Sequence, residues 1–456
     1  MRCSNNWNST PYLPEERREE YHAPIICRIA PDATSVTVQW FDNGCSGSHQ
    51  IIYSKWGCPG ETVLPLIGET IRINGLNDQT EYCIYILAEN GRKSRLRRFR
   101  TGTVPGTVVS YLHPQDDAYA FSGQYVCSPS LVRLPNGALL ASNDYYIAGG
   151  AQNVTTIFRS DDNGTSWRYV TDIMPCFWGT LFWHRDALYL LGMSTEYGDL
   201  LIGRSDDEGK NWCCPTVIAR GAGNAKYNGL HRAPMRIETA AGRLWTAIDY
   251  GSWAHKEFRN ALFSIPENTD LLKADNWVRT EFLTHTDALP DINDGKWALE
   301  GNAICMPDGN IANILRYSIG KAQLNVTHPD HPEEMPVCTG LIDLPVGHTK
   351  FELLHAPGGT YYAIGNIPPM RTRLVLLSSD DLIHWHFERY LIDGSALDET
   401  KNAFQYPAAL SEDGKLSVLC RTAYNCANSW HNSNYITFHS FSIQSSNCFS
   451  EYHPCL

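Results

Sequence analysis

The stretch Ser160-Asp-Asp162-Asn-Gly164-Thr-Ser-Trp167 decides the fold class of this 456-residue chain. Its spacing, S-x-D-x-G-x-x-W, returns in Ser205-Asp-Asp207-Glu-Gly209-Lys-Asn-Trp212, and Ser378-Ser-Asp380-Asp-Leu-Ile-His-Trp385 is a copy with leucine in place of glycine. The pattern is typical of a hairpin turn in which the aspartate accepts backbone N–H groups, the glycine takes a positive φ and the tryptophan packs between strands. We therefore expect a structural role for Ser160, Asp162, Gly164, Trp167, Ser205, Asp207, Gly209, Trp212, Ser378, Asp380 and Trp385.

A longer repeat surrounds these motifs. From about residue 104 the chain shows six times an apolar strand, a tight turn and a second apolar strand, with turns at positions 137, 187, 242, 309, 359 and 414. The spacing leaves room for a four-stranded sheet in each unit. Because one such sheet would leave a face unburied, six of them must stack radially around an axis, which predicts a six-bladed β-propeller.

Residues 22–103 show a different pattern, with short alternating strands at 34–40, 50–53 and 70–73 that predict a sandwich with Trp40 in its core. The segment Leu76-Asn-Asp-Gln-Thr-Glu-Tyr82 resembles the leucine-to-tyrosine corner of fibronectin type III domains, and residues 98–102 resemble their last strand. No titratable cluster occurs in this region, which is typical of a spacer or docking module. The sequence does not identify a protein partner for this domain.

The composition excludes several classes of protein. Apolar residues make up 43% of the chain, which excludes intrinsic disorder, and a net charge of −12 argues against a nucleic-acid partner. The chain has no run of 18 apolar residues for a membrane span. The N-terminus lacks the apolar stretch of a signal peptide and the fifteen cysteines are scattered, so we expect a cytoplasmic protein. No spacing indicates a metal site or a phosphate-binding loop, so we predict no cofactor.

The ends of the inner strands predict where a ligand binds. In a propeller, the start of the first strand and the end of the second strand of each blade lie near the same end of the axis. Several cations at these positions favour an anionic ligand, because an arginine can bind a carboxylate with two hydrogen bonds, each of which contributes about 1.5–3 kcal/mol. The alternative interpretation is a buried network of salt bridges. Aromatic faces there suit sugar rings, although each alone is also typical of core packing. The candidates are Arg232, Arg316, Arg371, Arg373, Arg421, Lys350, Gln405, Trp178, Tyr197 and Tyr250.

The two intact tryptophan motifs and the degenerate third resemble the Asp-boxes of the sialidase (neuraminidase) superfamily, and this resemblance covers about residues 108–442. It implies an all-β chain with a tail (1–21), a fibronectin type III-like sandwich (22–103), a six-bladed sialidase-like propeller (104–445) and a second tail (446–456). Members place a glutamate at the start of one inner strand and an arginine on the next strand, and Leu299-Glu300-Gly-Asn302 followed by Leu315-Arg316 is similar.

The last blade of the family opens with a tyrosine, which Phe404-Gln-Tyr406-Pro matches. The resemblance implies that Tyr406 is the nucleophile and Glu300 its base, which departs from the usual pair of catalytic carboxylates. It also implies that Arg316 and either Arg371 or Arg373 hold the anion. An acid/base aspartate is expected in a loop of the first blade, for which Asp144 is the candidate.

The sequence also departs from the family. Tyr125-Val-Cys-Ser-Pro129 replaces the Arg-Ile-Pro motif of the first blade, and Arg421 stands where the family has a glutamate, so we expect a rearranged anion site with Arg421 as compensation. The segment Leu230-His231-Arg232 and the nearby Tyr250 look similar to propeller lyases that cleave rhamnose–glucuronate linkages. In such an elimination a base, here His231 or Tyr250, removes the proton beside a neutralised carboxylate.

Three functions follow. The first is an exo-acting glycoside hydrolase that removes a terminal anionic sugar, sialic or uronic acid, from a small oligosaccharide or glycoside. The second is a β-elimination lyase directed at uronates, and the third is a non-catalytic glycan-binding propeller. The Tyr406–Glu300 couple discriminates between them, because a binding module has no need of it.

Overall fold

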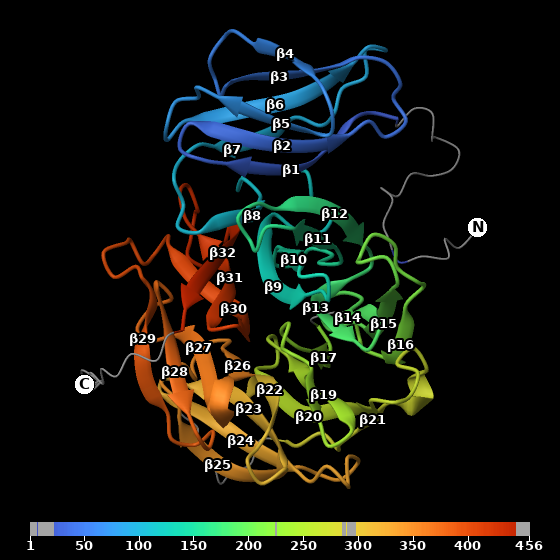
Figure 1. Cartoon of the computed structure of the whole chain (residues 1–456), viewed down its shortest axis with the longest axis vertical. Coiled ribbons are helices and arrows are strands. Elements are labelled where there is room, and N and C mark those ends of the chain that lie inside the picture. Colours follow the sequence, from blue (N-terminus) through green and yellow to red (C-terminus); the bar gives the residue numbers. More distant parts are fainter. Residues whose placement is uncertain (1–6, 8–21, 224–225, 285–288, 290–297, 444–456) are drawn as a thin grey trace.

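The computed structural model describes residue 7 and residues 22–223, 226–284, 289 and 298–443. Within these ranges the chain is built of strands, with short 3-10 turns at Ala274–Asn276 and Pro357–Gly359 and no α-helix, so the all-β prediction is confirmed. Figure 1 shows a sandwich of two sheets beside a ring of sheets. No helix in the described ranges is long and apolar enough to cross a membrane.

The N-terminal strands form the predicted sandwich. One sheet has the order β1-β2-β5 and the other β4-β3-β6-β7. Trp40 is 8% exposed, as expected of a core residue. The Tyr82 hydroxyl accepts the backbone N–H of Asn77 at 2.9 Å and so closes the corner predicted at residues 76–82. The strands are β1 (Ile25–Pro31), β2 (Ser35–Phe41), β3 (His49–Lys55), β4 (Thr62–Leu66), β5 (Thr70–Asn74), β6 (Glu81–Ala88) and β7 (Arg97–Arg100).

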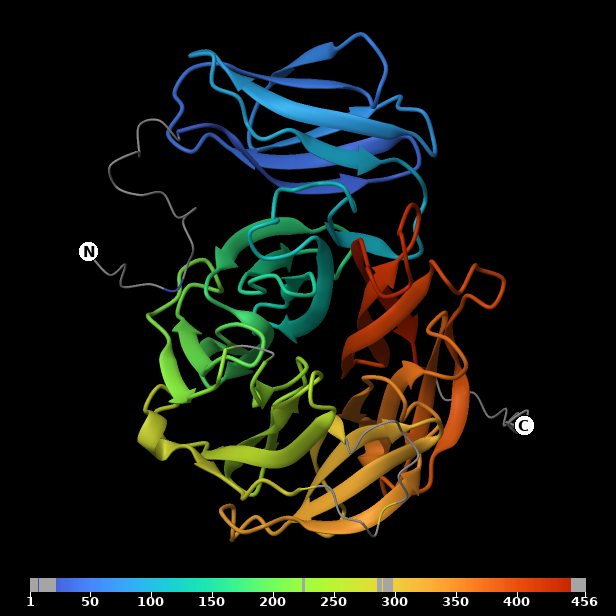
Figure 2. The same cartoon turned by 180° about the vertical axis from the view of Figure 1, so that it is seen from behind.

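Six antiparallel sheets in the described ranges form the blades of a β-propeller (Figures 1 and 2). The last blade is completed by β8 (Thr107–Tyr111), which precedes all other propeller strands in the chain and pairs with β32. This pairing ties the two ends of the ring together. The blades are β9 (Tyr125–Arg133) to β12 (Arg168–Ile173); β13 (Phe177–His184) to β16 (Thr216–Ala219); β17 (Gly229–His231) to β21 (Val278–Arg279); β22 (Leu299–Cys305) to β25 (Val337–Asp343); β26 (Glu352–His355) to β29 (His386–Asp393); and β30 (Ala403–Glu412), β31 (Lys415–Ala423), β32 (Tyr435–Ser442) with β8.

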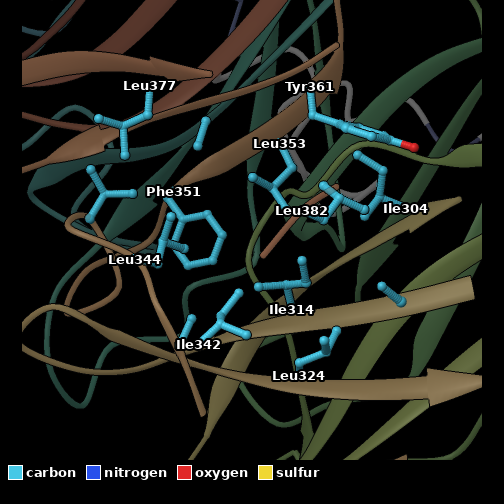
Figure 3. Close-up of a cluster of buried hydrophobic side chains, with 14 of the residues drawn as sticks. Ile304, Ile314, Leu324, Ile342, Leu344, Phe351, Leu353, Tyr361, Leu377 and Leu382 are labelled. Carbon is cyan, nitrogen blue, oxygen red and sulfur yellow. The ribbon is translucent and has the colours of Figure 1, made fainter. Parts of the chain in front are cut away.

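The six repeated turns are confirmed. Each predicted position lies in or beside the turn that joins two paired strands, for example between β9 and β10 (Leu139–Tyr146) and between β30 and β31. The blades pack face to face through apolar side chains. Figure 3 shows one such layer, a hydrophobic cluster that includes Ile314 and Leu324 of the fourth blade and Leu353 and Leu377 of the fifth. Burying each of these side chains contributes about 1.5–3 kcal/mol, which is what holds neighbouring blades together.

The first two tryptophan motifs form the expected turn. The Asp162 carboxylate accepts the N–H of Ser166 at 2.8 Å, and Asp207 accepts that of Asn211 at 2.8 Å. Gly164 has φ 87° and Trp167 is 5% exposed, as the pattern requires. These contacts are the ones expected of a hairpin turn.

The third motif is shifted by one residue from the prediction. Ser379 and Asp381, rather than Ser378 and Asp380, make the turn, because the Ser379 hydroxyl accepts the N–H of Leu382 at 2.9 Å. The turn is one residue shorter than in the other copies, so its serine lies six residues before Trp385 instead of seven. Ser378 and Asp380 instead bond outward, to Glu388 and Thr360.

The sandwich is fixed to the outer strands of the first and last blades. Arg28 of β1 donates to the carbonyls of Val108 and Val109 in β8, at 2.6 and 2.8 Å. The Gln39 amide exchanges two hydrogen bonds with the backbone of Tyr169 in β12, at 2.7 and 3.2 Å. Since β8 and β12 are the outermost strands of their blades, the sandwich contacts the rim of the ring.

Candidate active site

Four inner strands carry a residue in the left-handed region at equivalent places. Ser128, Trp178, Glu300 and Tyr406 have φ of 51–53°, and each lies where the register between the first and second strand shifts. Such a bulge turns a side chain out of the regular alternation of the strand. A non-glycine residue in this conformation costs about 1–3 kcal/mol, so the surrounding structure must hold it in place.

Buried side chains of neighbouring blades hold three of these bulges. Asp144 Oδ2 accepts the N–H of Trp178 at 2.7 Å, and Asp249 Oδ2 accepts the N–H of Glu300 at 2.8 Å. Lys350 donates to Glu352 at 2.6 Å and to the carbonyl of the residue that follows Tyr406. Asp144, Asp249 and Lys350 are at most 1% exposed, and the hydrogen bonds to the bulges offset the cost of burying their charges.

The fold brings the predicted Tyr406–Glu300 couple together. The Tyr406 hydroxyl donates to Glu300 Oε1 at 2.9 Å, although the two residues belong to the sixth and fourth blades. An Arg316 guanidinium nitrogen lies 2.9 Å from Glu300 Oε2 and 3.5 Å from the Tyr406 oxygen. Burial and the Glu300 carboxylate raise the pKa of Tyr406, while the nearby arginines act against them.

Two further arginines flank the tyrosine ring. The guanidinium carbons of Arg371 and Arg421 lie 5.7 and 5.4 Å from the centre of the Tyr406 ring. Burial and the two other arginines lower the pKa of Arg371 to about 10. We call Arg316, Arg371 and Arg421 the arginine cluster. Among the described residues, Glu300 is the one carboxylate that forms an ion pair with this cluster, so the cluster has an excess of positive charge.

The structure separates Arg371 from its alternative. Arg371 donates to the buried Gln405 amide at 2.6 Å, and its guanidinium lies 4.7 Å from the Trp430 ring. Arg373, two residues later, points to the loop and donates to the carbonyl of Pro368 at 3.0 Å. Gln405 thus orients an arginine of the cluster.

Two other predicted ligand-binding cations are enclosed by protein. Arg232 is 1% exposed and donates to the Leu191 carbonyl and the Thr180 hydroxyl, at 2.8 and 2.9 Å. Lys350, also 1% exposed, holds the Tyr406 bulge. The contacts of both residues therefore point to roles in positioning the site.

The candidate base His231 lies in an aromatic cluster on the other side of the ring. Its Nδ1 lies 3.2 Å from Asp249 Oδ2, and the Trp178 ring packs edge-on at 4.5 Å. Tyr197 lies 6.0 Å from His231 in the same cluster. The Tyr250 ring instead packs against Phe282, at 5.6 Å.

Asp144, the candidate acid/base, is fully buried. One oxygen accepts the Thr155 hydroxyl at 2.5 Å and the other the N–H of Trp178. Burial raises the pKa of Asp144 well above its usual value. Among the described residues, no hydrogen bond links Asp144 to Tyr406 or Glu300, so its catalytic role stays a prediction.

Tyr146 is a residue of the site that the sequence analysis missed. The Tyr146 ring lies 5.8 Å from Arg421, and the Trp253 ring 5.5 Å from Arg316. Tyr146 ends β10, so the rule that strand-two ends face the site could have found it. Trp430 comes from the long loop between β31 and β32, where no periodic signal exists. No cluster of three metal-ligating side chains occurs within the described ranges.

No protein family model and no curated protein sequence matches this chain. Solved structures share its fold. The α-L-arabinofuranosidase of Fusarium graminearum, solved with arabinobiose, is 11% identical over 74% of this chain and 98% of its own, with a TM-score of 0.50. The leech intramolecular trans-sialidase, complexed with 2,7-anhydro-Neu5Ac, is 12% identical over 92% of both chains, also with a TM-score of 0.50. An ulvan lyase aligns with 97% of this chain and 95% of its own, at 11% identity and a TM-score of 0.45. At these identities the likeness to the arabinofuranosidase and the trans-sialidase shows a common fold.

Proposed function

We propose that this protein is an exo-acting glycoside hydrolase that removes a terminal anionic sugar, a sialic or uronic acid, from a small oligosaccharide. The main observation in support of this proposal is the 2.9 Å hydrogen bond from Tyr406 to Glu300 beside the arginine cluster. A glycan-binding module would gain nothing from a tyrosine that shares its proton with a carboxylate. The proposal agrees with the fold, which is also that of an arabinofuranosidase and a trans-sialidase.

The couple supplies a nucleophile that no single residue could. A tyrosine has an ordinary pKa near 10 and is a weak nucleophile at neutral pH. As the Tyr406 oxygen bonds to the anomeric carbon, its proton passes to Glu300 Oε1, and the bond to the leaving oxygen breaks as that oxygen takes up a proton. In the second step water attacks the same carbon and gives up a proton, which balances the first, and Tyr406 leaves and recovers its own proton from Glu300.

The arginine cluster selects the substrate. A carboxylate on the sugar ring would replace water around Arg316, Arg371 and Arg421, each charged hydrogen bond contributing about 1.5–3 kcal/mol. Arg421 comes from the sixth blade, which adjoins the first blade where the expected arginine is missing. We propose that Arg421 takes over the role of that missing arginine.

A direct experiment compares three substrates: a fluorogenic sialoside, a fluorogenic glucuronide, and an oligosaccharide with a uronate linkage. Cleavage of the first two is measured by fluorescence, and elimination from the third by the ultraviolet absorbance of the unsaturated product. Fluorescence without absorbance is expected, and it identifies the sugar. Binding of all three without turnover would favour a glycan-binding propeller and overturn the hydrolase. The Tyr406→Phe variant serves as the inactive control.

A β-elimination lyase is the second candidate, favoured by the His231–Asp249 contact of 3.2 Å. A base held by a carboxylate could remove the proton beside a uronate carboxyl group. In that case absorbance of the unsaturated product grows, the Tyr406→Phe variant keeps activity, and the His231→Asn variant loses it.

We also propose that the propeller belongs to the sialidase superfamily and that its tryptophan motifs are Asp-boxes. The serine-to-aspartate bonding in all three copies supports this assignment. The sandwich is proposed to be of the fibronectin type III kind, which its sheet orders and the Tyr82 corner support. Its contacts suggest that it braces the junction of the first and last blades.

A further inference from the structure

One carboxylate near the site differs from all others there. Asp144 and Asp249 each accept a backbone N–H group with one oxygen and a neighbouring side chain with the other, and Glu300 is paired with Arg316. Glu196, just after β14 (Ala187–Met193) in the second blade, is only half-buried and forms no ion pair with any residue in the described ranges. A carboxyl group that is reachable and has no cation beside it can hold a proton.

The position of Glu196 is fixed by a dedicated partner. The Gln152 amide donates to Glu196 Oε2 at 2.8 Å, and Gln152 itself is 1% exposed with a left-handed backbone, φ 46°. Tyr197, the next residue, is also left-handed with φ 59°, and its hydroxyl accepts the N–H of Trp253 at 3.2 Å. The carboxyl group of Glu196 is therefore held by Gln152 at Oε2 and also has the Tyr197 hydroxyl beside it.

Glu196 lies across the ring from the arginine cluster. The second blade faces the fifth, so the cations and the Tyr406–Glu300 couple come from blades four to six, and Glu196 comes from the opposite half. Tyr146 connects the halves: its phenol interacts electrostatically with both Glu196 and Tyr406, and Arg421 lies 5.8 Å from its ring. A sugar whose carboxylate is held by the cluster would therefore present its other side to Glu196.

The ionisable groups around Glu196 come from three blades. They are Tyr146 and Cys127 of the first blade, Tyr197 of its own blade and His231 of the third. Burial raises the pKa of Glu196, which favours the protonated form that a general acid needs, while the hydrogen bonds of Gln152 and Tyr197 and the nearby His231 act in the other direction.

We propose that Glu196 is the general acid, and then the general base, of the hydrolysis assigned above, on which this inference rests. In the first step Glu196 gives its proton to the glycosidic oxygen, so the leaving group departs as a neutral alcohol while Tyr406 bonds to the anomeric carbon. In the second step the Glu196 carboxylate takes a proton from the attacking water. The enzyme thereby returns to its starting protonation state.

The test uses the full chain and the sugar that wild type releases. With Glu196→Gln, kcat/KM for an alkyl glycoside should fall about 10²–10⁴-fold, because this leaving group needs a proton. For a nitrophenyl glycoside, whose leaving group needs none, the first step should change by less than about tenfold. Added azide, a nucleophile that needs no base, should then restore steady turnover and yield the glycosyl azide.

The pH profile gives a second readout that needs no variant. Wild-type activity on the alkyl glycoside should fall as pH rises through the pKa of Glu196, and this limb should be absent for the first step with the nitrophenyl glycoside. Asp144→Asn is the matched control, which should show no dependence on the leaving group. The acid role would be overturned if Glu196→Gln lost the same activity on both glycosides and azide restored none of it. It would also be overturned if Asp144→Asn, instead of Glu196→Gln, showed the dependence on the leaving group. Either result would leave the hydrolase proposal standing. An inactive wild type would overturn both.

Discussion

The Tyr406→Phe substitution tests the central contact of the proposed mechanism. It removes the hydroxyl that donates to Glu300 and costs about 1.5–3 kcal/mol of stability, the usual value for a hydrogen bond to a charged group. The phenyl ring keeps its place between Arg371 and Arg421, at 5.7 and 5.4 Å, and Glu300 keeps Arg316 at 2.9 Å. The anion site should therefore stay intact.

Turnover should nevertheless be lost. Removal of a catalytic nucleophile lowers kcat on the order of 10³–10⁶-fold, which corresponds to about 4–8 kcal/mol of activation free energy. The assay pairs kcat on a fluorogenic substrate with the Kd of a non-hydrolysable thioglycoside measured by calorimetry. The expected Kd lies within about threefold of wild type, since the hydroxyl is not one of the charged groups that bind the carboxylate.

Tyr250→Phe is the matched control, because Tyr250 packs against Phe282 and has no contact with the couple among the described residues. Its kcat should equal that of wild type. If Tyr406→Phe retained turnover within about tenfold of wild type, a difference of about 1.4 kcal/mol, Tyr406 would not be the nucleophile. Loss of activity in Tyr250→Phe instead would favour the elimination reaction.

Three further results are expected. Arg371→Lys keeps the charge but loses the planar fork and the stacking on Trp430, so KM should rise about tenfold or more with kcat little changed, as steady-state kinetics would show. Ser379→Ala should lower stability by about 1 kcal/mol because a buried N–H loses its acceptor, whereas Ser378→Ala should not; thermal melting of both variants tests the corrected position of the third motif. Burial raises the pKa of Asp172 to about 6, so the folded state binds a proton that the unfolded state releases. This stabilisation should be present below about pH 4 and lost as pH rises to about 6, an effect of up to about 3 kcal/mol that denaturant unfolding of Asp172→Asn should no longer show.

Most of the fold can be predicted from the spacing of residues that are close in the sequence. A turn such as Asp162 to Trp167 is built from neighbours in sequence, so its residue types can be recognised without knowing the rest of the chain. The six repeated strand–turn–strand units, and the sandwich with its Tyr82 corner, are equally local. The third motif was misplaced by one residue because Ser378 and Ser379 are both serines, and only the length of the folded turn decides which one bonds.

The active site depends on contacts that no local pattern encodes. Tyr406 and Glu300 are 106 positions apart and meet because bulged inner strands of the fourth and sixth blades bring them together. The family resemblance predicted this pair, but only the burial of the surrounding side chains shows which other residues lie at the site. The sequence by itself determined an all-β chain of repeated blades with an arginine-rich ring, since these follow from periodicity and residue type. The tertiary structure alone decided that Arg371 rather than Arg373 joins the tyrosine, and that Asp144 is enclosed while Glu196 stays reachable, because the packing of neighbouring blades determines which side chains solvent can reach.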